Sequence, residues 1–409
     1  MGLTTPLGHT VAEGWERCLS GHSGIGACTR FDTNGHACHA AGLVPAYELK
    51  DLRGPKNQKF MNAGARHLVQ AAQRALAGAS LGIESLPPSR LAVHVGSGRV
   101  GPEPSEFFRA FEVAHTPEGS PDWDQLGGRA SRLVDPYFPL RTLSNSGAAL
   151  LAMEICARGP SSNFVQSDVA SALALNAAFW DLKERRCDVA MAAGFDCLVT
   201  PASYLAFEKR GLLSSRQPEE ALRPFDREAD GLVLGEGAAA LVLERLTDAR
   251  KRSAPVLAEI AGIATSVSAG NSIVPFSDHG AMSTSVRRAA SAPFDFLVAS
   301  GFGIPDADCR EAAILADIVG EQVPVTAFKG LTSYLGAATA LVEIALGVMA
   351  LNHRIIPPIA RHRQAADGVG INLVSQAVAL DENKACSALF LSNSWTGQSA
   401  AVYVKSCMG

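Results

Sequence analysis

Residues 163–186, NFVQSDVASALALNAAFWDLKERR, join a predicted strand to a predicted helix without a Gly or Pro between them. The first five residues favour a strand. From Ala170 an Ala- and Leu-rich run favours a helix, and its charged residues gather at the end, over residues 183–186. The sequence therefore predicts a sharp turn at residues 167–169.

Asp168 occupies this turn, where unpaired backbone N–H groups and the helix dipole stabilise negative charge. A cysteine at this place would be activated as a thiolate. An aspartate needs no activation and accepts acyl groups poorly. Two interpretations follow: Asp168 caps the helix, because Asp is a favoured N-cap residue, or it takes part in the chemistry of a site at the turn.

Length and composition set the class of protein. The 409 residues include 47% hydrophobic side chains, which is ample for one large α/β unit or two domains. The net charge of −4 and the lack of basic blocks argue against a nucleic-acid or membrane-surface binder.

The nine cysteines are scattered, odd in number and free of C-x-x-C pairs, which favours reduced thiols over disulfides or a zinc site. No run of about 18 apolar residues predicts a membrane span, and residues 1–4 open no signal peptide. We expect a cytoplasmic protein without a metal or cofactor.

Strands and helices alternate along the chain. Helices are predicted at residues 11–20 and 59–81, and strands at residues 91–95, 188–196, 237–244, 294–300, 323–328, 387–394 and 399–405. The late succession of strands weakly echoes the early one. The pattern predicts two similar α/β halves, residues 1–250 and 251–409.

Residues 223–238, RPFDREADGLVLGEGA, closely resemble the signature of β-ketoacyl-carrier-protein synthases, the ketosynthases. Further matches follow in order at residues 2–25, 134–160, 328–351 and 355–358. The resemblance covers almost the whole chain and implies a thiolase-like fold of two α/β halves in α-β-α-β-α layers. Ketosynthases usually place a strand before the turn that residues 2–8 resemble, and we expect that strand to be missing here.

Ketosynthase catalysis, as the resemblance implies it, uses one Cys and two His. The Cys position falls on Asp168 or, by an alternative alignment, on Val169. The His positions fall on Ser300 and Tyr334, and residues 392–398 replace the family's Gly-Phe-Gly-Gly loop. The matching positions outside this triad keep the family's residues: Asp308, Glu311, Lys329 and Glu236.

This combination resembles the chain-length factor, the ketosynthase subunit of type II polyketide systems that lacks the catalytic Cys. The resemblance implies a silent subunit that forms a heterodimer with an active ketosynthase and meets the acyl carrier protein through that complex. The subunit would shape the acyl tunnel in aromatic or aryl polyene biosynthesis. Known factors often carry Gln at the Cys position, so this chain belongs to an atypical branch.

Aromatic residues in the irregular segment 104–135 are the first candidates to line the far end of that tunnel, although ordinary packing is the commoner role for any individual phenylalanine. The candidates are Phe107, Phe108 and Phe111 in this segment and, after them, Phe138 and Tyr204 outside it. Two alternatives stay open: a dead ketosynthase homodimer that acts as a scaffold, and an acyl hydrolase or dehydratase that uses Asp168, Ser300 and Tyr334.

Overall fold

The computed structural model describes all residues except 83, 85, 99–106, 269–278 and 408–409. Two mixed sheets dominate the described part of the chain, in the orders β1-β7-β6-β4-β5 and β12-β10-β9-β14-β15-β8. Two small antiparallel pairs, β2 with β3 and β11 with β13, lie outside them.

The first sheet comes from the first part of the chain: β1 (Gly2–Thr4), β4 (Leu91–Ser97), β5 (Ser161–Phe164), β6 (Val189–Cys197) and β7 (Glu236–Glu244). β4 runs parallel to β5 and β6, whereas β7 runs antiparallel to β6 and β1. Every residue of β4 is buried, as expected for a strand covered on both faces. Helix α2 (Ala63–Gly78) contacts β1, β6 and β7, and α6 (Ser146–Glu154) packs beside it.

The second sheet comes from the second part: β8 (Ala258–Val267), β9 (Phe296–Val298), β10 (Pro324–Thr326), β12 (Asn372–Leu373), β14 (Ser387–Asn393) and β15 (Gln398–Ser406). Helix α10 (His279–Ala289) contacts β8, β15 and α11 (Pro305–Val319). The remaining elements are α1 (Val11–Ser20), β2 (Ile25–Ala27), β3 (Ala40–Gly42), α8 (Pro201–Glu208), α9 (Leu246–Lys251), α12 (Lys329–Thr332), β11 (Ile355–Ile356) and β13 (Val378–Ala379).

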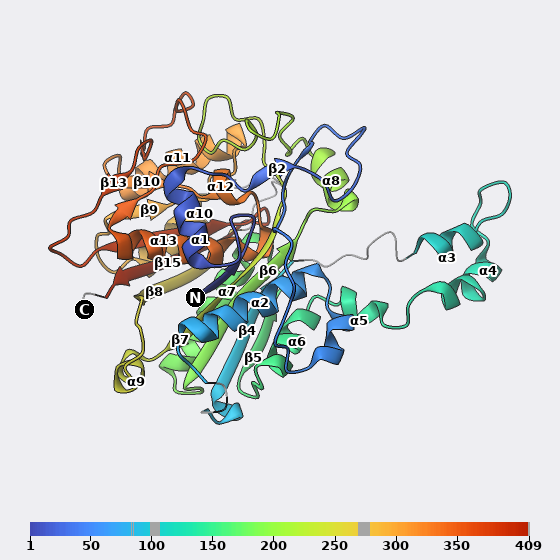
Figure 1. Ribbon diagram of the computed structural model, residues 1–409. Helices are drawn as coiled ribbons and strands as arrows, with labels where there is room; N and C mark the ends of the chain where they lie inside the picture. The colour runs from blue at the N-terminus through green and yellow to red at the C-terminus, as the bar shows by residue number, and fades with distance from the viewer. Residues whose placement is uncertain (83, 85, 99–106, 269–278, 408–409) are drawn as a thin grey trace.

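Helices α7 (Ala170–Lys183) and α13 (Thr339–His353) form the layer between the two sheets (Figure 1). α7 contacts β4 and β6 of one sheet and β8 and β15 of the other, while α13 contacts β7, β14 and β15. The layers therefore follow the order α-β-α-β-α, and the predicted thiolase-like fold is confirmed.

Residues 336–353 are apolar enough over 18 residues to cross a membrane, but 83% of them are buried between the sheets. α13 is thus a core helix of this fold. Its neighbour α7 packs closely because two glycines leave room for it. A Cβ on Gly96 would lie 2.3 Å from the Ser171 backbone nitrogen, and one on Gly194 would lie 2.5 Å from the Ser171 Cβ.

Two local predictions need correction. Residues 2–4, expected to belong to a turn that no strand precedes, themselves form β1, because they pair with residues 238–240 of β7. The helix predicted at residues 59–81 begins later, as α2, because residues 55–60 form a 3₁₀ turn and Asn62 caps the helix at Ala65. By contrast, α1 occupies residues 11–20 as predicted, behind a Thr10–Glu13 capping box.

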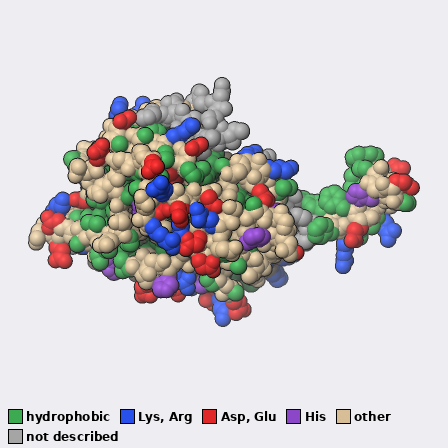
Figure 2. Space-filling view, turned by 90° about the horizontal axis from the view of Figure 1, so that it is seen from above, with side chains coloured by type: hydrophobic (Ala, Val, Ile, Leu, Met, Phe, Trp, Pro, Cys, Tyr) green, Lys and Arg blue, Asp and Glu red, His purple; other side chains and the backbone are tan. Residues whose placement is uncertain are grey.

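Residues 107–134 form an arm that projects from the body, as Figures 1 and 2 show, and α5 (Phe138–Thr142) lies at its base beside α6. The arm carries α3 (Phe108–Val113) and α4 (Trp123–Gly127), and its small core consists of Ala110, Ala114 and Ala130 with Leu126 and Val134 packed against them. Large apolar side chains of the arm and its base are exposed: Phe108, Phe111, Trp123, Leu133, Tyr137, Leu140 and Leu143.

Candidate functional site

The turn between β5 and α7 is a 3₁₀ turn, Ser167–Val169, as the sequence predicted. Ser167 adopts a positive φ of 49°, an uncommon conformation for a residue with a side chain. Asp168 is buried and does not cap α7, because the cap position is Val169 and no side chain caps the helix. The capping interpretation of Asp168 is therefore wrong.

The Asp168 carboxylate instead meets Tyr334, which lies 166 residues further along the chain. The Tyr334 hydroxyl donates to Asp168 Oδ2 at 3.0 Å, and the Ser167 hydroxyl donates to the same oxygen at 3.1 Å. Trp395 Nε1 donates to the Tyr334 oxygen at 2.9 Å. Phe302 packs against both aromatic rings, with centroid distances of 6.1 Å to Tyr334 and 5.1 Å to Trp395. We call Ser167, Asp168, Phe302, Tyr334 and Trp395 the Asp168 cluster.

Burial governs the acid–base properties of this cluster. It raises the pKa of Asp168 to about 6, although the Lys329 charge and the Tyr334 hydrogen bond act in the opposite direction. Burial and the neighbouring carboxylate also raise the pKa of Tyr334 well above its ordinary value. The sequence predicted a carboxylate stabilised by the helix dipole, but burial makes the ionised form less favourable than in water and raises the pKa.

Ser300 lies beside the cluster, just after β9, and is buried. Its hydroxyl accepts a hydrogen bond from Asn393 Nδ2 at 3.0 Å. Its backbone N–H and that of Gly301 both donate to the Glu311 carboxylate at 2.8 Å. Glu311 therefore fixes the turn that carries Ser300.

Lys329 connects the surrounding polar groups. Its Nζ donates to the Ser300 carbonyl and pairs with Glu343 at 2.9 Å, and it lies 5.0 Å from the centre of the Phe302 ring. Burial raises the pKa of Glu343 to about 7. Asp308 accepts the backbone N–H groups of residues 225, 302 and 303. These groups hold the loops around the site.

Glu236 lies outside this neighbourhood, at the start of β7. It accepts hydrogen bonds from Arg30 at 2.5 Å, from Cys197 at 3.0 Å and from the Val44 backbone at 3.2 Å. Polar partners, His67 and Arg30 among them, hold the pKa of its carboxyl near 2 despite burial. Its role is to join three segments of the first half.

The alternative Cys position, Val169, packs against Ala172, Ala340 and Ala400 in the core. The side chain that meets Tyr334, and through it Trp395, is that of Asp168.

The aromatic tunnel candidates lie in two places. Phe107 on the arm packs edge-on against Phe138 at its base, with ring centres 4.6 Å apart, while Phe108 and Phe111 on the arm are 59% and 51% exposed. Tyr204 is fully buried, and its hydroxyl donates to the Ala40 carbonyl at 2.6 Å.

Sequence reasoning assigned no role to Ser167, Trp395, Asn393 or Glu343, which complete the site. For Trp395 and Asn393 a signal existed, because residues 392–398 form a short Ser- and Thr-rich connection between two apolar strands. Glu343 gave none, since a glutamate within an apolar helix pattern does not reveal its partner.

The arrangement offers hydrogen bonds rather than nucleophiles. The Asp168 cluster contains no thiol and no imidazole, and within the described residues no group of three His, Cys, Asp or Glu side chains could hold a metal ion. The one proton that Tyr334 can donate already binds Asp168. The Tyr334, Ser167 and Trp395 donors thus all bind acceptors within the cluster, whereas Asp168 Oδ1 is buried and has no hydrogen-bond partner among the described residues.

Residues 1–249 match the family "Beta-ketoacyl synthase, N-terminal domain", and residues 257–363 match "Beta-ketoacyl synthase, C-terminal domain". The 3-oxoacyl-(acyl-carrier-protein) synthase 2 of Staphylococcus aureus is 28% identical over 368 residues, 88% of each chain. The protein of the same name from Vibrio cholerae is 28% identical over 386 residues, 91% of this chain and 90% of that one.

Solved structures share the fold over the whole length. The ishigamide ketosynthase/chain length factor superposes with a TM-score of 0.86 at 23% identity, covering 100% of this chain and 98% of that one. A type II PKS acyl-carrier protein in complex with its ketosynthase gives a TM-score of 0.82 at 22% identity, over 99% of this chain and 98% of that one.

Proposed function

The chain belongs to the β-ketoacyl synthase family, and we propose that it is a catalytically silent subunit of a type II polyketide ketosynthase. In this proposal the chain pairs with an active ketosynthase, as a chain-length factor does, and shapes the tunnel that holds the growing acyl chain. The partner carries out the decarboxylative Claisen condensation.

The Asp168 cluster is the observation that carries the proposal. A condensing enzyme needs a thiolate that holds the acyl chain as a thioester and donors that stabilise the enolate formed when malonate loses CO₂. Acyl transfer to Asp168 would give a mixed anhydride, which water cleaves readily. Tyr334 and Trp395 bind within the cluster, so their donors are not available to an enolate.

The hydrolase alternative has less support. Ser300 is buried, and the hydrogen bond to its hydroxyl comes from Asn393, whose side-chain nitrogen donates and cannot act as a general base. No hydrogen bond joins Asp168 to Ser300 within the part of the chain that the structure describes.

The arm supports a role for a second chain. Seven exposed large apolar side chains lie on the arm and its base, and the core of the arm is small: three buried alanines with Leu126 and Val134 packed against them. Monomeric proteins rarely expose apolar surface in this density, and such surface commonly marks a protein interface. Phe107, Phe108 and Phe111 would then act in a tunnel that the two chains form together, because the arm that carries them projects away from the body of its own chain (Figure 1).

The first test is an intact-mass measurement on this chain co-purified with a ketosynthase from the same gene neighbourhood and exposed to an acyl-carrier thioester. We expect a one-to-one complex in which the acyl adduct is confined to the partner. The Asp168→Asn variant serves as the control and should leave the adduct unchanged. An adduct on this chain would contradict the proposal.

The tunnel role has its own test. Phe107→Ala and Phe111→Ala should lengthen the products, since removing a ring enlarges the space at the end of the tunnel. Leu19→Ala, an exposed apolar position on α1, is the matched control. Unchanged product length in an intact complex would remove that phenylalanine from the tunnel.

A silent homodimer shares every feature of the site and differs only in its partner. Gel filtration of the chain expressed alone distinguishes the two. A stable soluble homodimer favours the scaffold, and aggregation of the unpaired chain favours the heterodimer.

A further inference from the structure

Two cysteines stand at the ends of the loop that joins β2 to β3. The two strands pair antiparallel, and the Cys28 N–H, just after β2, donates to the His39 carbonyl at 2.8 Å. Cys38 is the residue before His39. Opposed Cα atoms in such a pair lie about 5.5 Å apart and one residue along a strand adds about 3.4 Å, which gives a Cys28–Cys38 Cα separation of about 6.5 Å. A disulfide joins Cα atoms that are about 4.4–6.8 Å apart, so the hairpin holds the two residues within reach of a bridge.

The two thiols meet at the hydroxyl of Tyr204, on α8. That hydroxyl donates to the Ala40 carbonyl at 2.6 Å, and the Cys38 thiol donates to the same carbonyl at 3.5 Å. Cys28 interacts with the Tyr204 hydroxyl, and all three side chains belong to one apolar cluster. Both cysteine side chains therefore point toward the same place rather than to opposite faces of the hairpin.

Helix α8 also fixes the loop between the two cysteines. Glu208, at the end of this helix, accepts the Ala37 N–H at 2.5 Å and forms a hydrogen bond with His36 Nδ1 at 2.8 Å. These bonds hold the loop immediately before Cys38. The loop therefore keeps Cys38 near Cys28 before any oxidation takes place.

The two thiols differ in exposure. Cys28 is partly exposed, so it is the thiol that a small molecule in solution reaches, whereas Cys38 is buried. Burial raises the pKa of Cys38 to about 11, and the neighbouring Cys28 acts in the same direction. In such a pair the accessible thiol meets the oxidant and the buried thiol attacks the product of that first step.

We propose that Cys28 and Cys38 form a reversible disulfide by exchange with a low-molecular-weight disulfide such as oxidised glutathione. The Cys28 thiolate, its proton lost to solvent, attacks one sulfur of that disulfide, and the first thiolate leaves and takes a proton from solvent. Cys38 then attacks the Cys28 sulfur of the mixed disulfide, and its proton passes to the departing second thiolate. Two protein thiols are thus oxidised while one small disulfide is reduced to two thiols, so electrons and protons balance.

The bridge would bear on the Asp168 cluster, because the apolar cluster that contains both thiols extends to Tyr334 and Trp395. Phe207, also on α8, has its ring centre 5.9 Å from that of Tyr334 and 6.3 Å from that of Trp395. A covalent link between the ends of β2 and β3 at Tyr204 would therefore stiffen one wall around the Asp168 cluster. The bridge itself forms whether or not the chain is a silent subunit.

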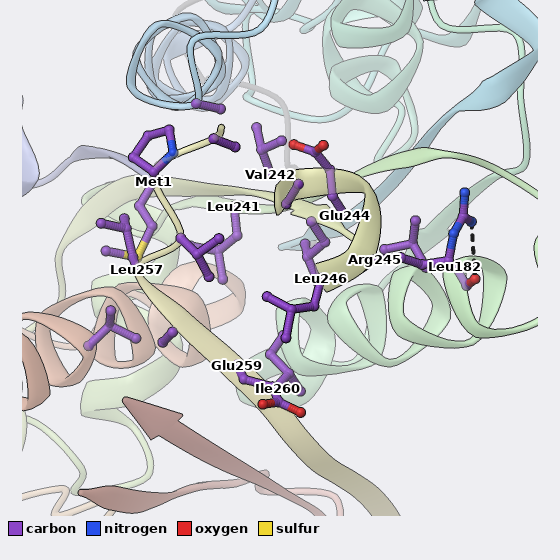
Figure 3. A pocket seen from close by; sticks show the side chains of 18 of the residues that line it. Met1, Leu182, Leu241, Val242, Glu244, Arg245, Leu246, Leu257, Glu259 and Ile260 are labelled. Carbon is purple, nitrogen blue, oxygen red and sulfur yellow. Dashed lines mark hydrogen bonds between the residues drawn. The ribbon is translucent and has the colours of Figure 1, made fainter. Parts of the chain in front are cut away.

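Cys187 is the matched buried thiol for comparison. It is buried like Cys38, and burial likewise raises its pKa to about 11. Charged residues shift this pKa further, and no cysteine is among them in the described part of the chain. The Cys187 carbonyl accepts a hydrogen bond from Arg245 at 2.7 Å. Arg245 also lines a cavity of about 320 Å³ beside β7, and the described residues around that cavity include no cysteine either (Figure 3).

The test incubates the reduced 409-residue chain in glutathione buffers of increasing oxidised fraction, quenches the exchange with acid, and labels the remaining thiols of the unfolded chain with N-ethylmaleimide. Trypsin cuts after Arg30, between the two cysteines, so the bridge links peptides 18–30 and 31–50. We expect the labelled thiols to fall from nine to seven, which is nine less the two in the bridge, with this linked peptide pair as the product. Excess dithiothreitol should restore all nine.

The variants assign the two roles. Cys38→Ser should leave Cys28 as a mixed disulfide with glutathione, Cys28→Ser should leave Cys38 reduced, and Cys187→Ser should lose two labelled thiols as the native chain does. A glutathione adduct that persists on Cys28 of the native chain would overturn the proposal, and so would an unchanged count of labelled thiols. A linked pair that survives Cys28→Ser would also overturn it, because Cys18 lies on the same peptide.

Discussion

Replacing Asp168 by Asn should remove a pH-dependent cost from the folded protein. Burial raises the pKa of Asp168 to about 6 from an ordinary value of 3.8. One pKa unit corresponds to about 1.4 kcal/mol, so the ionised carboxylate costs the folded state about 3 kcal/mol. The folded protein holds the proton more tightly than the unfolded chain does. The proton on Asp168 therefore stabilises the folded state fully below about pH 4, and this stabilisation is lost as the pH rises through about 6.

The asparagine of this variant cannot titrate, and its side-chain oxygen still accepts the Tyr334 hydrogen bond. Between pH 4.5 and pH 8 the wild type loses most of the Asp168 contribution, whereas the variant has none to lose. We therefore expect the free energy of unfolding of Asp168→Asn, relative to that of the wild type, to be about 2 kcal/mol higher at pH 8 than at pH 4.5. Asp196, Asp308 and Glu343 also have raised pKa values, but they titrate in both proteins and cancel in the difference.

The assay is guanidinium unfolding of both proteins at pH 4.5 and pH 8, and the exposed Glu382→Gln is the control. If Asp168→Asn changes stability equally at both pH values, the carboxylate is not held as the structure places it. Condensation by the complex should not respond to this substitution, so stability and activity report independently.

Three further outcomes are expected. Lys329→Met breaks the buried ion pair with Glu343 and should lower the free energy of unfolding by about 3–5 kcal/mol. The loss should be larger at pH 8 than at pH 6, because the pKa of Glu343 is about 7 and its carboxylate is ionised mainly at the higher pH. An equal loss of stability at both pH values would exclude that pairing. Phe111→Ser on the exposed arm should change the free energy of unfolding of the isolated chain by less than about 0.5 kcal/mol. The same substitution should weaken the complex with the ketosynthase partner in gel filtration, and an unaffected complex would exclude this side chain from the interface. Gly96→Ala places a Cβ 2.3 Å from the Ser171 backbone nitrogen and should cost about 1–3 kcal/mol by displacing α7, so a neutral effect on the melting temperature would refute the close packing of that helix.

The sequence predicted correctly the helices and strands that are specified by their own residues and do not depend on contacts with distant parts of the chain. Helix α1 carries its own capping box, and β4 and β6 are apolar runs bounded by polar residues, so their positions follow from the sequence. β1 could not be predicted in this way. Three residues make a strand only because β7 offers its edge.

The same distinction holds for the site. The motifs predicted that Asp168, Ser300 and Tyr334 share one pocket, but spacing along the chain does not show that Asp168 and Tyr334 share a hydrogen bond across 166 residues. The direction of the Asp168 pKa shift was mispredicted for a related reason. The position of Asp168 at the start of a helix can be predicted from the sequence, whereas the desolvation that raises its pKa depends on how completely the folded protein buries the carboxylate.

The composition of the Asp168 cluster bears on how a silent subunit could be built. Deleting a thiol and two imidazoles from a buried site would leave polar groups without partners, each of which costs about 1–3 kcal/mol. Here Trp395 donates to Tyr334, Tyr334 donates to Asp168 Oδ2, and Phe302 packs against the two aromatic rings, so that Asp168 Oδ1 is the one cluster oxygen that is buried without a partner among the described residues. In the proposed function, the site is occupied by these side chains rather than by an acyl group. The proposed function then requires that substrate be held by surfaces outside the cluster, and the arm, with Phe108 and Phe111 exposed, is the part of this chain that could supply them to a partner.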